Sequence, residues 1–487
     1  MAHLSLYKFL FYVVESEMLS SILNQVKKQK LLQHLKITHS FVITSGFLNN
    51  NIILSELIQS AAVFGSDYPL RIIYGERLFF WNIHIRVTSA SRNPNESFKA
   101  FALMLRRGIS PDHMTYPFLI RAAARLTRIE LGGAVHSLLF KDGFAVDLFI
   151  SNALIHMYGT CGDIANARAV FDEMRQRNVV TWNSLLDGYT KNGDVVNARN
   201  LFEEMPQRDI VSWSALMNGY VKNKDACSAI AVFEKMLEDG PLPNEVTMIS
   251  AVHACGMLCD IEKGETMHRY IMEKSMRISL PLRTALIDMY AKCGDMKKAV
   301  AVFRESETKD VLMWNAVIGG LGSHGLVREA MEMYGEMVRS VEPDDITFLS
   351  LISACANAGM VEEARGVFGR IKEPKAEHYA CLVNVMARAG EVEEAFELVK
   401  RMGRRGSASM LGAVLSGCVR YGKMEMGEEV GKMLVEVDPE HDGRYVGLAN
   451  VYADLMRWDD VDCLRKDMYR RGVKKCAGFS HATTPIS

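Results

Sequence analysis

The sequence has little proline, no closely spaced cysteine pair of metal-binding form, and almost no net charge. Only 12 of 487 residues are proline, and 57 Lys and Arg nearly balance 58 Asp and Glu. Few prolines beside 29 methionines favour helices over β-sandwiches. No apolar run approaches the roughly 18 residues of a membrane span. The 49% hydrophobic share excludes a disordered or collagen-like chain. A balanced total charge still permits a nucleic-acid partner, because a local basic stripe is sufficient.

The ten cysteines are scattered and form no C-x-x-C. Cys255, Cys355 and Cys418 each fall near the end of an apolar helical segment, so we expect buried small side chains rather than zinc ligands or disulfides. No histidine is followed by x-Glu, and neither a Gly-rich phosphate loop after a strand nor a G-x-S-x-G elbow occurs. The sequence therefore predicts no enzyme, no metal and no cofactor.

Internal repetition is the strongest signal. Segments 157–174, 188–205 and 219–236 share one pattern and are offset by 31 residues each. Turn glycines give the same period, although Gly325 and Gly359 are 34 apart. Repeats of 31 residues therefore mix with repeats of about 35 residues. Such a period indicates an array of supersecondary modules.

Residues 179–209 predict one helical hairpin. The first apolar face consists of Trp182, Leu185, Leu186 and Tyr189. Gly193 is expected to close that helix in the left-handed conformation, and Asp194 to cap the next one. The second apolar face consists of Val195, Ala198, Leu201, Phe202 and Met205. One hairpin cannot bury both faces, so neighbouring hairpins must stack into an α-solenoid with a concave surface.

The tetratricopeptide string W-x-x-L-G-x-x-Y is absent, and that family keeps a constant period of about 34 residues. The chain instead resembles plant pentatricopeptide repeat proteins of the class with alternating P, L and S repeats, over roughly 31–473. Standard repeats end in Pro111-Asp112, Pro243-Asn244 and Pro343-Asp344. The resemblance implies an all-α fold, a right-handed α-solenoid of stacked helix-turn-helix repeats with a concave RNA-binding groove. The repeats are 78–112, 113–147, 148–178, 179–209, 210–244, 245–279, 280–310, 311–344, 345–375 and 376–407.

This reading divides the chain into an organelle-targeting leader (1–30), degenerate repeats (31–77), tandem repeats (78–407), E-type degenerate repeats (408–473) and a short tail (474–487). The leader contains acidic residues and no arginine, unlike a typical transit peptide. Import is therefore implied by the resemblance alone, with the mitochondrion as destination and the chloroplast as the alternative.

Two polar places recur at matched offsets in six repeats. The fifth place holds Asn82, Asn152, Asn183, Ser214, Thr284 and Asn315, and the last place holds Asp112, Asn178, Asp209, Asn244, Asp310 and Asp344. Taken singly, an Asn or Thr in the first turn of a helix is explained by N-capping. The repeated pairing instead points to side chains that read base edges, with the Asp fixing the orientation of a neighbouring donor.

The resemblance implies a code in which Asn/Asp favours U, Asn/Asn a pyrimidine (Y), Ser/Asn A and Thr/Asp G. Four repeats do not match it and read as n: Pro117/Asp147, Ile249/Ser279, Leu349/Lys375 and Ala380/Ser407. The implied target is U-n-Y-U-A-n-G-U-n-n, with an edited C four bases further on. Interspersed Lys191, Lys222, Lys224, Lys292 and Arg328 are read as solvated charge that can also form a phosphate track.

The resemblance also implies function. It predicts a site-recognition factor for organellar C-to-U editing that binds single-stranded organellar RNA. Because His-x-Glu and Cys-x-x-Cys are missing, a DYW-type cytidine deaminase pentatricopeptide protein is expected in trans, with multiple organellar RNA editing factors as further partners. Residues 408–473 are the expected docking region. The alternatives are RNA stabilisation, splicing or translation without editing, and a tetratricopeptide-like protein scaffold.

Overall fold

The computed structural model describes residues 19–25, 32–44, 51–62, 77–143, 147–403 and 407–474, and no β-strand occurs in these ranges. Of the expected leader and tail, only residues 19–25 and 474 lie within the described ranges. The chain forms two compact units, residues 1–250 and 251–487, which we call the N-terminal and C-terminal units.

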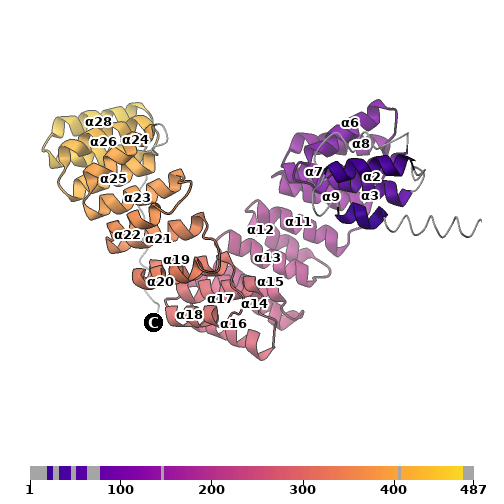
Figure 1. The fold of residues 1–487 in the computed structure, drawn as a ribbon, viewed down its shortest axis with the longest axis horizontal. Coiled ribbons are helices and arrows are strands. Elements are labelled where there is room, and N and C mark those ends of the chain that lie inside the picture. The colour runs from indigo at the N-terminus through magenta and orange to yellow at the C-terminus, as the bar shows by residue number, and fades with distance from the viewer. Residues whose placement is uncertain are drawn as a thin grey trace, which may run out of the picture. The chain divides into compact units, whose positions relative to one another are not determined.

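Each unit is a succession of helices in chain order (Figure 1). The N-terminal unit contains α2 (Leu32–Thr44), α3 (Asn51–Ala62), α5 (Leu78–Ala90), α6 (Asn95–Arg106), α7 (Tyr116–Leu126), α8 (Ile129–Asp142), α9 (Leu148–Thr160), α10 (Ile164–Glu173), α11 (Val179–Lys191), α12 (Val195–Glu204), α13 (Ile210–Lys222) and α14 (Ala226–Asp239). Helix α15 (Glu245–Leu258) spans the division. The C-terminal unit contains α16 (Ile261–Glu273), α17 (Leu280–Lys292), α18 (Met296–Arg304), α19 (Val311–Ser323), α20 (Val327–Met337), α21 (Asp345–Ala358), α22 (Val361–Phe368), α23 (Ala376–Ala389), α24 (Val392–Met402), α25 (Ala408–Arg420), α26 (Met424–Val437), α27 (Asp442–Asp454) and α28 (Trp458–Arg470).

The predicted turn between α11 and α12 is confirmed. Gly193 has φ +79°, a left-handed conformation that costs glycine nothing. Asp194 then caps α12, and its side chain accepts a hydrogen bond from the Asn197 amide at 3.1 Å. The cap satisfies an amide that the helix itself leaves without a partner.

The predicted apolar faces form the core of the hairpin. Leu185, Leu186 and Ala198 are fully buried. Trp182 and Val195 are only half-buried, which the periodicity did not predict. Trp182 lies at the junction with the preceding hairpin, where its ring meets that of Phe171 edge to face with centroids 4.9 Å apart.

Neighbouring hairpins pack through their first helices. In the N-terminal unit α7 contacts α9, α9 contacts α11 and α11 contacts α13; in the C-terminal unit the same relation runs through α17, α19, α21, α23 and α25. The approach is close where small residues meet, because a Cβ on Gly159 of α9 would lie 2.8 Å from the Cα of Gly188 of α11. Stacking therefore buries apolar surface between neighbouring hairpins, as a repeat array requires.

The predicted burial of Cys255, Cys355 and Cys418 is confirmed, since all three are fully buried. Among the described residues, no group of three or more His, Cys, Asp or Glu side chains is placed to hold a metal ion. None of the described helices combines the length and the apolar character that crossing a bilayer would require.

Candidate nucleic-acid interface

The last-place residues stand at the start of helices. Asn178, Asp209, Asn244, Asp310 and Asp344 each directly precede a helix and accept a hydrogen bond from the backbone N–H three residues on, at 2.9 to 3.0 Å. Asp112 accepts from the N–H of Thr115 at 3.0 Å, one turn before α7. The N-capping explanation therefore applies to the last place. It is wrong for the fifth place, whose side chains lie within the first helix of each repeat, beyond the cap.

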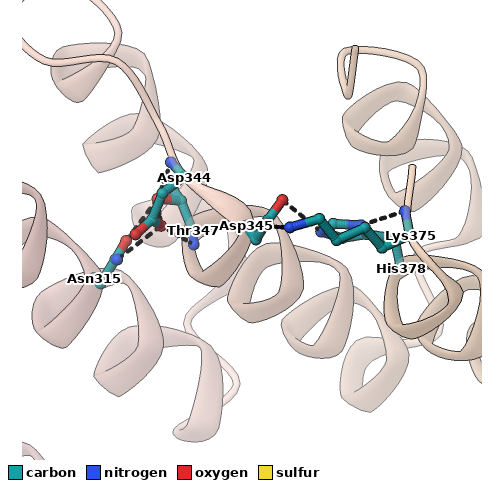
Figure 2. A network of polar contacts seen from close by, with 6 residues as sticks. All are labelled: Asn315, Asp344, Asp345, Thr347, Lys375 and His378. Atoms are coloured by element: carbon teal, nitrogen blue, oxygen red, sulfur yellow. Dashed lines mark hydrogen bonds and ion pairs between the residues drawn. The ribbon is translucent and has the colours of Figure 1, made fainter. Parts of the chain in front are cut away.

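The structure joins the two predicted places in all three Asn/Asp repeats. The amide nitrogen Nδ2 donates to the carboxylate Oδ1, from Asn82 to Asp112 at 2.9 Å, from Asn183 to Asp209 at 3.0 Å and from Asn315 to Asp344 at 2.9 Å. Figure 2 shows the Asn315 amide directed at Asp344. Because a carboxylate only accepts, this bond also fixes which end of the amide is nitrogen.

The bond changes the acidity of the aspartates. Burial alone raises the carboxyl pKa, but hydrogen bonds outweigh it, among them those from the paired Asn and from the backbone amides of the second and third residues of the next repeat. The pKa of Asp112, Asp209 and Asp344 is therefore lower than its ordinary value. The three carboxylates are charged at neutral pH.

In the other three pairs, no hydrogen bond joins the fifth-place and last-place side chains among the described residues. The hydroxyls of Ser214 and Thr284 donate back to the carbonyls of Ile210 at 2.6 Å and Leu280 at 2.9 Å. Asn152 Oδ1 is buried and has no hydrogen-bond partner among the described residues. These pairs therefore keep more unused hydrogen-bonding capacity than the Asn/Asp pairs.

The repeat with Leu349 and Lys375 has a different network at the corresponding place (Figure 2). The Lys375 ammonium pairs with Asp345, and the Lys375 backbone N–H donates to Nδ1 of the buried His378 at 3.0 Å. A cation and an apolar residue thus replace the acid and the amide.

Sequence reasoning missed a second row of side chains. The second place of many repeats is apolar and yet more than half exposed: Phe79, Met114, Phe149, Val180, Val211, Val246, Leu312 and Ile346. Each lies three residues before a fifth place. Except for Met114, which precedes α7, the two residues are therefore one helical turn apart and share a helix face. Their recurrence at matched places makes this row a candidate interaction surface. The register contained this signal, but exposure cannot be read from residue type.

Two of the lysines predicted to contact phosphates, Lys191 and Lys292, are already paired with carboxylates. Lys191 pairs with Asp187 at 2.6 Å and Lys292 with Asp288 at 2.7 Å, each one turn back in its own helix. Such exposed pairs contribute little free energy, so a phosphate can replace the carboxylate. Lys222 and Lys224 are exposed.

These features define a class: a tandem helical-hairpin array with polar side chains at matched places on successive hairpins. The chain belongs to the pentatricopeptide repeat family. Models described as PPR repeat family match residues 177–210, 208–256 and 309–357, and models described as PPR repeat match 149–179, 283–311, 346–373 and 377–407. An E motif model matches residues 421–482. The repeat boundaries themselves stay predictions.

Relatives support the family across the chain. Pentatricopeptide repeat-containing protein At5g08305 of Arabidopsis thaliana is 47% identical, covering 93% of this chain and 87% of its own length. Two other Arabidopsis relatives are At2g22410, named mitochondrial (33%, 94% and 84%), and At1g08070, named chloroplastic (31%, 77% and 48%). The crystal structure of PPR10 in complex with an 18-nt psaJ RNA element matches in fold, with TM-score 0.50 and 16% identity over 93% of this chain and 84% of that one.

Proposed function

We infer that this protein binds single-stranded RNA sequence-specifically and serves as the site-recognition factor for organellar C-to-U editing. The observation that carries the proposal is the hydrogen-bonded Asn/Asp pair, which occurs in three separate repeats. The hydrogen bond has nearly the same length in all three. Reading one base per helical repeat with two or three side chains is an established mode of RNA recognition.

The chemistry of a pair suits a base edge. Once Asn183 Nδ2 donates to Asp209, the amide still offers its second N–H and an oxygen lone pair. Uracil presents an acceptor beside its N3–H donor, which matches that combination. Val180 and Val211, exposed at the second places on either side, provide apolar surfaces against which the base can pack.

The six pairs assign six bases. Asn82/Asp112, Asn183/Asp209 and Asn315/Asp344 are assigned U, Asn152/Asn178 a pyrimidine, Ser214/Asn244 A and Thr284/Asp310 G. The proposed target is U-n-Y-U-A-n-G-U-n-n, upstream of the edited C. Asn183→Thr, with Asp209 kept, is expected to move the preference at the fourth base from U towards G, measured by binding to the four base variants of that RNA.

The editing role rests on the family and on the E motif match at residues 421–482. The deaminase acts in trans and is recruited through residues 408–473. On α28 and before it, Met456, Trp458 and Tyr469 are strongly exposed, which suits a protein contact. The names of two relatives support an organelle, and we propose the mitochondrion, with the chloroplast as the alternative.

Loss of the gene product in the plant tests the editing role. Organellar RNA is sequenced from mutant and wild-type plants, and C-to-U conversion is compared at every site. We expect conversion to be lost at a C four bases beyond a match to the target. Unchanged conversion throughout, with altered splicing or transcript ends instead, would contradict the editing role and favour RNA stabilisation, splicing or translation.

A further inference from the structure

A third side chain completes each Asn/Asp pair, and it comes from the next repeat. In repeat 179–209 it is Ser212, whose hydroxyl oxygen lies 2.7 Å from Asn183 Oδ1. The same third place supplies Thr115, 2.7 Å from Asn82 Oδ1, and Thr347, 2.6 Å from Asn315 Oδ1. The three hydroxyls are buried. They recur in both compact units, as Figure 2 shows for Thr347.

The hydroxyl proton has one best acceptor. The Ser212 oxygen is 2.7 Å from Asn183 Oδ1 and 2.8 Å from Asp209 Oδ1, and its single proton serves one of them. Asp209 Oδ1 already accepts from Asn183 Nδ2 at 3.0 Å and from the Ser212 N–H at 2.9 Å. Asn183 Oδ1 has no other donor in the hydrogen bonds of the described residues. The proton therefore belongs on the Asn183 side.

The amide is then held at both ends. The carboxylate holds Nδ2 and the hydroxyl holds Oδ1, so the plane of the Asn183 amide is fixed. A rotated amide would place its oxygen against the carboxylate, acceptor against acceptor. What remains for a ligand is one N–H and one lone pair, each at a fixed position.

Repeat 148–178 lacks this arrangement although it has the hydroxyl. There Thr181 lies 3.0 Å from Asn178 Oδ1, and Asn152 Oδ1 is buried with no partner among the described residues. No hydrogen bond among the described residues holds the Asn152 amide oxygen. The two kinds of repeat thus differ in amide freedom and not in the residue at the fifth place.

We propose that Thr115, Ser212 and Thr347 are positioning residues that set the base selectivity of the preceding repeat by fixing the amide plane of Asn82, Asn183 and Asn315. The proposal rests on the proposed RNA-binding function. Uracil N3 carries a proton and cytosine N3 does not. An amide fixed with its oxygen towards N3 accepts from uracil and opposes cytosine. An amide free to rotate can turn its N–H to cytosine N3, so it tolerates both pyrimidines.

The test measures the affinity of the full chain for the proposed target with U or C at one base. Ser212→Ala is expected to lower the U:C affinity ratio at the fourth base by about threefold to tenfold, the worth of one hydrogen bond. Ser212→Thr keeps the hydroxyl and is expected to keep the ratio. In the C-terminal unit, Thr347→Val removes the hydroxyl at nearly constant shape, and Thr347→Ser keeps it, with the readout at the eighth base.

Thr181→Ala is the matched control. Thr181 and Ser212 both accept from the backbone N–H of the last-place residue, at 3.2 and 3.3 Å, so both alanine variants lose a capping bond. Only Ser212→Ala also loses a bond to a fifth-place amide. Thr181→Ala is therefore expected to leave the U:C ratio at the third base unchanged.

The outcomes distinguish failure of the positioning role from failure of the proposed RNA-binding function. An unchanged ratio in both Ser212→Ala and Thr347→Val overturns the positioning role while the RNA-binding function stands. An equal change at the third base in Thr181→Ala also overturns it, because the cause is then the lost cap. If Ser212→Ala does not fold, the Thr347 pair decides. A wild-type chain that prefers no base at any of the six assigned repeats overturns the proposed function itself.

Discussion

Asp209→Asn tests the pair with the smallest possible change. The carboxylate Oδ1 of Asp209 accepts from Asn183 Nδ2 at 3.0 Å, and the variant replaces that charge-assisted bond with a neutral one. Bonds to charged groups contribute about 1.5–3 kcal/mol and neutral ones about 0.5–1.5 kcal/mol, so the loss is about 1 kcal/mol. That difference corresponds to about a fivefold fall in the preference for U over C at the fourth base.

The fold should survive the change. Asp209 also caps α13, and Asn is as good an N-cap as Asp, so we expect the free energy of unfolding to stay within about 0.5 kcal/mol. Asp194→Asn is the control, because Asp194 caps α12 in the same way and its side chain bonds to Asn197 and not to a fifth-place residue. The assay is equilibrium binding of two ten-base RNAs that differ only in U or C at the fourth base.

Two results would refute this reasoning. A U:C ratio that is the same in wild type and Asp209→Asn means that the carboxylate does not act on the base through the amide. A similar fall in Asp194→Asn means that the change acts through general helix stability. A selective fall in Asp209→Asn alone would make its repeat behave like repeat 148–178, which has Asn at both places.

Three further predictions concern stability. Lys224 occupies the same turn position as Gly193 does in the preceding repeat, with φ +62°. Lys224→Gly should raise the free energy of unfolding by about 0.5–1 kcal/mol, because the relieved backbone strain exceeds the entropy that glycine adds to the unfolded chain. An unchanged free energy in urea unfolding would contradict this prediction. Arg208 donates to the carbonyls of Phe202 and Glu203, both at 2.8 Å, and its guanidinium lies 5.0 Å from the centroid of the Phe202 ring. Arg208→Ala should therefore lower the free energy of unfolding by about 1–2 kcal/mol. Arg208→Lys should restore only part of that stability, because lysine lacks the two-pronged guanidinium, and full restoration would contradict this explanation. Because the pKa of Asp209 is lowered, its stabilising hydrogen bonds are fully present above the ordinary carboxyl pKa of 3.8 and are lost as the pH falls through the lowered pKa. Acidification should therefore lower the free energy of unfolding of wild type more than that of Asp209→Asn. Parallel curves of unfolding free energy against pH for the two proteins would refute this prediction.

Local signals in the sequence predicted much of the hairpin. Gly193 followed by Asp194 specifies a left-handed residue and a cap, and both are present. These features depend on a few consecutive residues, so they can be read without knowing the fold. The buried Ala198 follows from the 3.6-residue period in the same way.

Features that depend on neighbouring repeats could not be predicted. Ser212 is 29 residues from Asn183, and its role requires the distance between two stacked helices. Thr115 and Thr181 both occupy the third place of a repeat. Thr115 bonds to a fifth-place amide, whereas Thr181 bonds to a last-place amide. Residue type alone does not distinguish them. The half-exposed Trp182 also depends on the neighbour, because Phe171 of the preceding hairpin receives its ring.

The most direct test of the central claim is the affinity of the chain for the proposed RNA and for a second RNA in which A at the fifth base and G at the seventh base are exchanged. Ser214/Asn244 and Thr284/Asp310 are assigned those bases, so both repeats are mismatched at once. We predict binding weaker by about tenfold or more, because a good base-edge contact discriminates by roughly 1 kcal/mol or more. Equal affinity for the two RNAs would contradict the claim that paired side chains on successive repeats read successive bases.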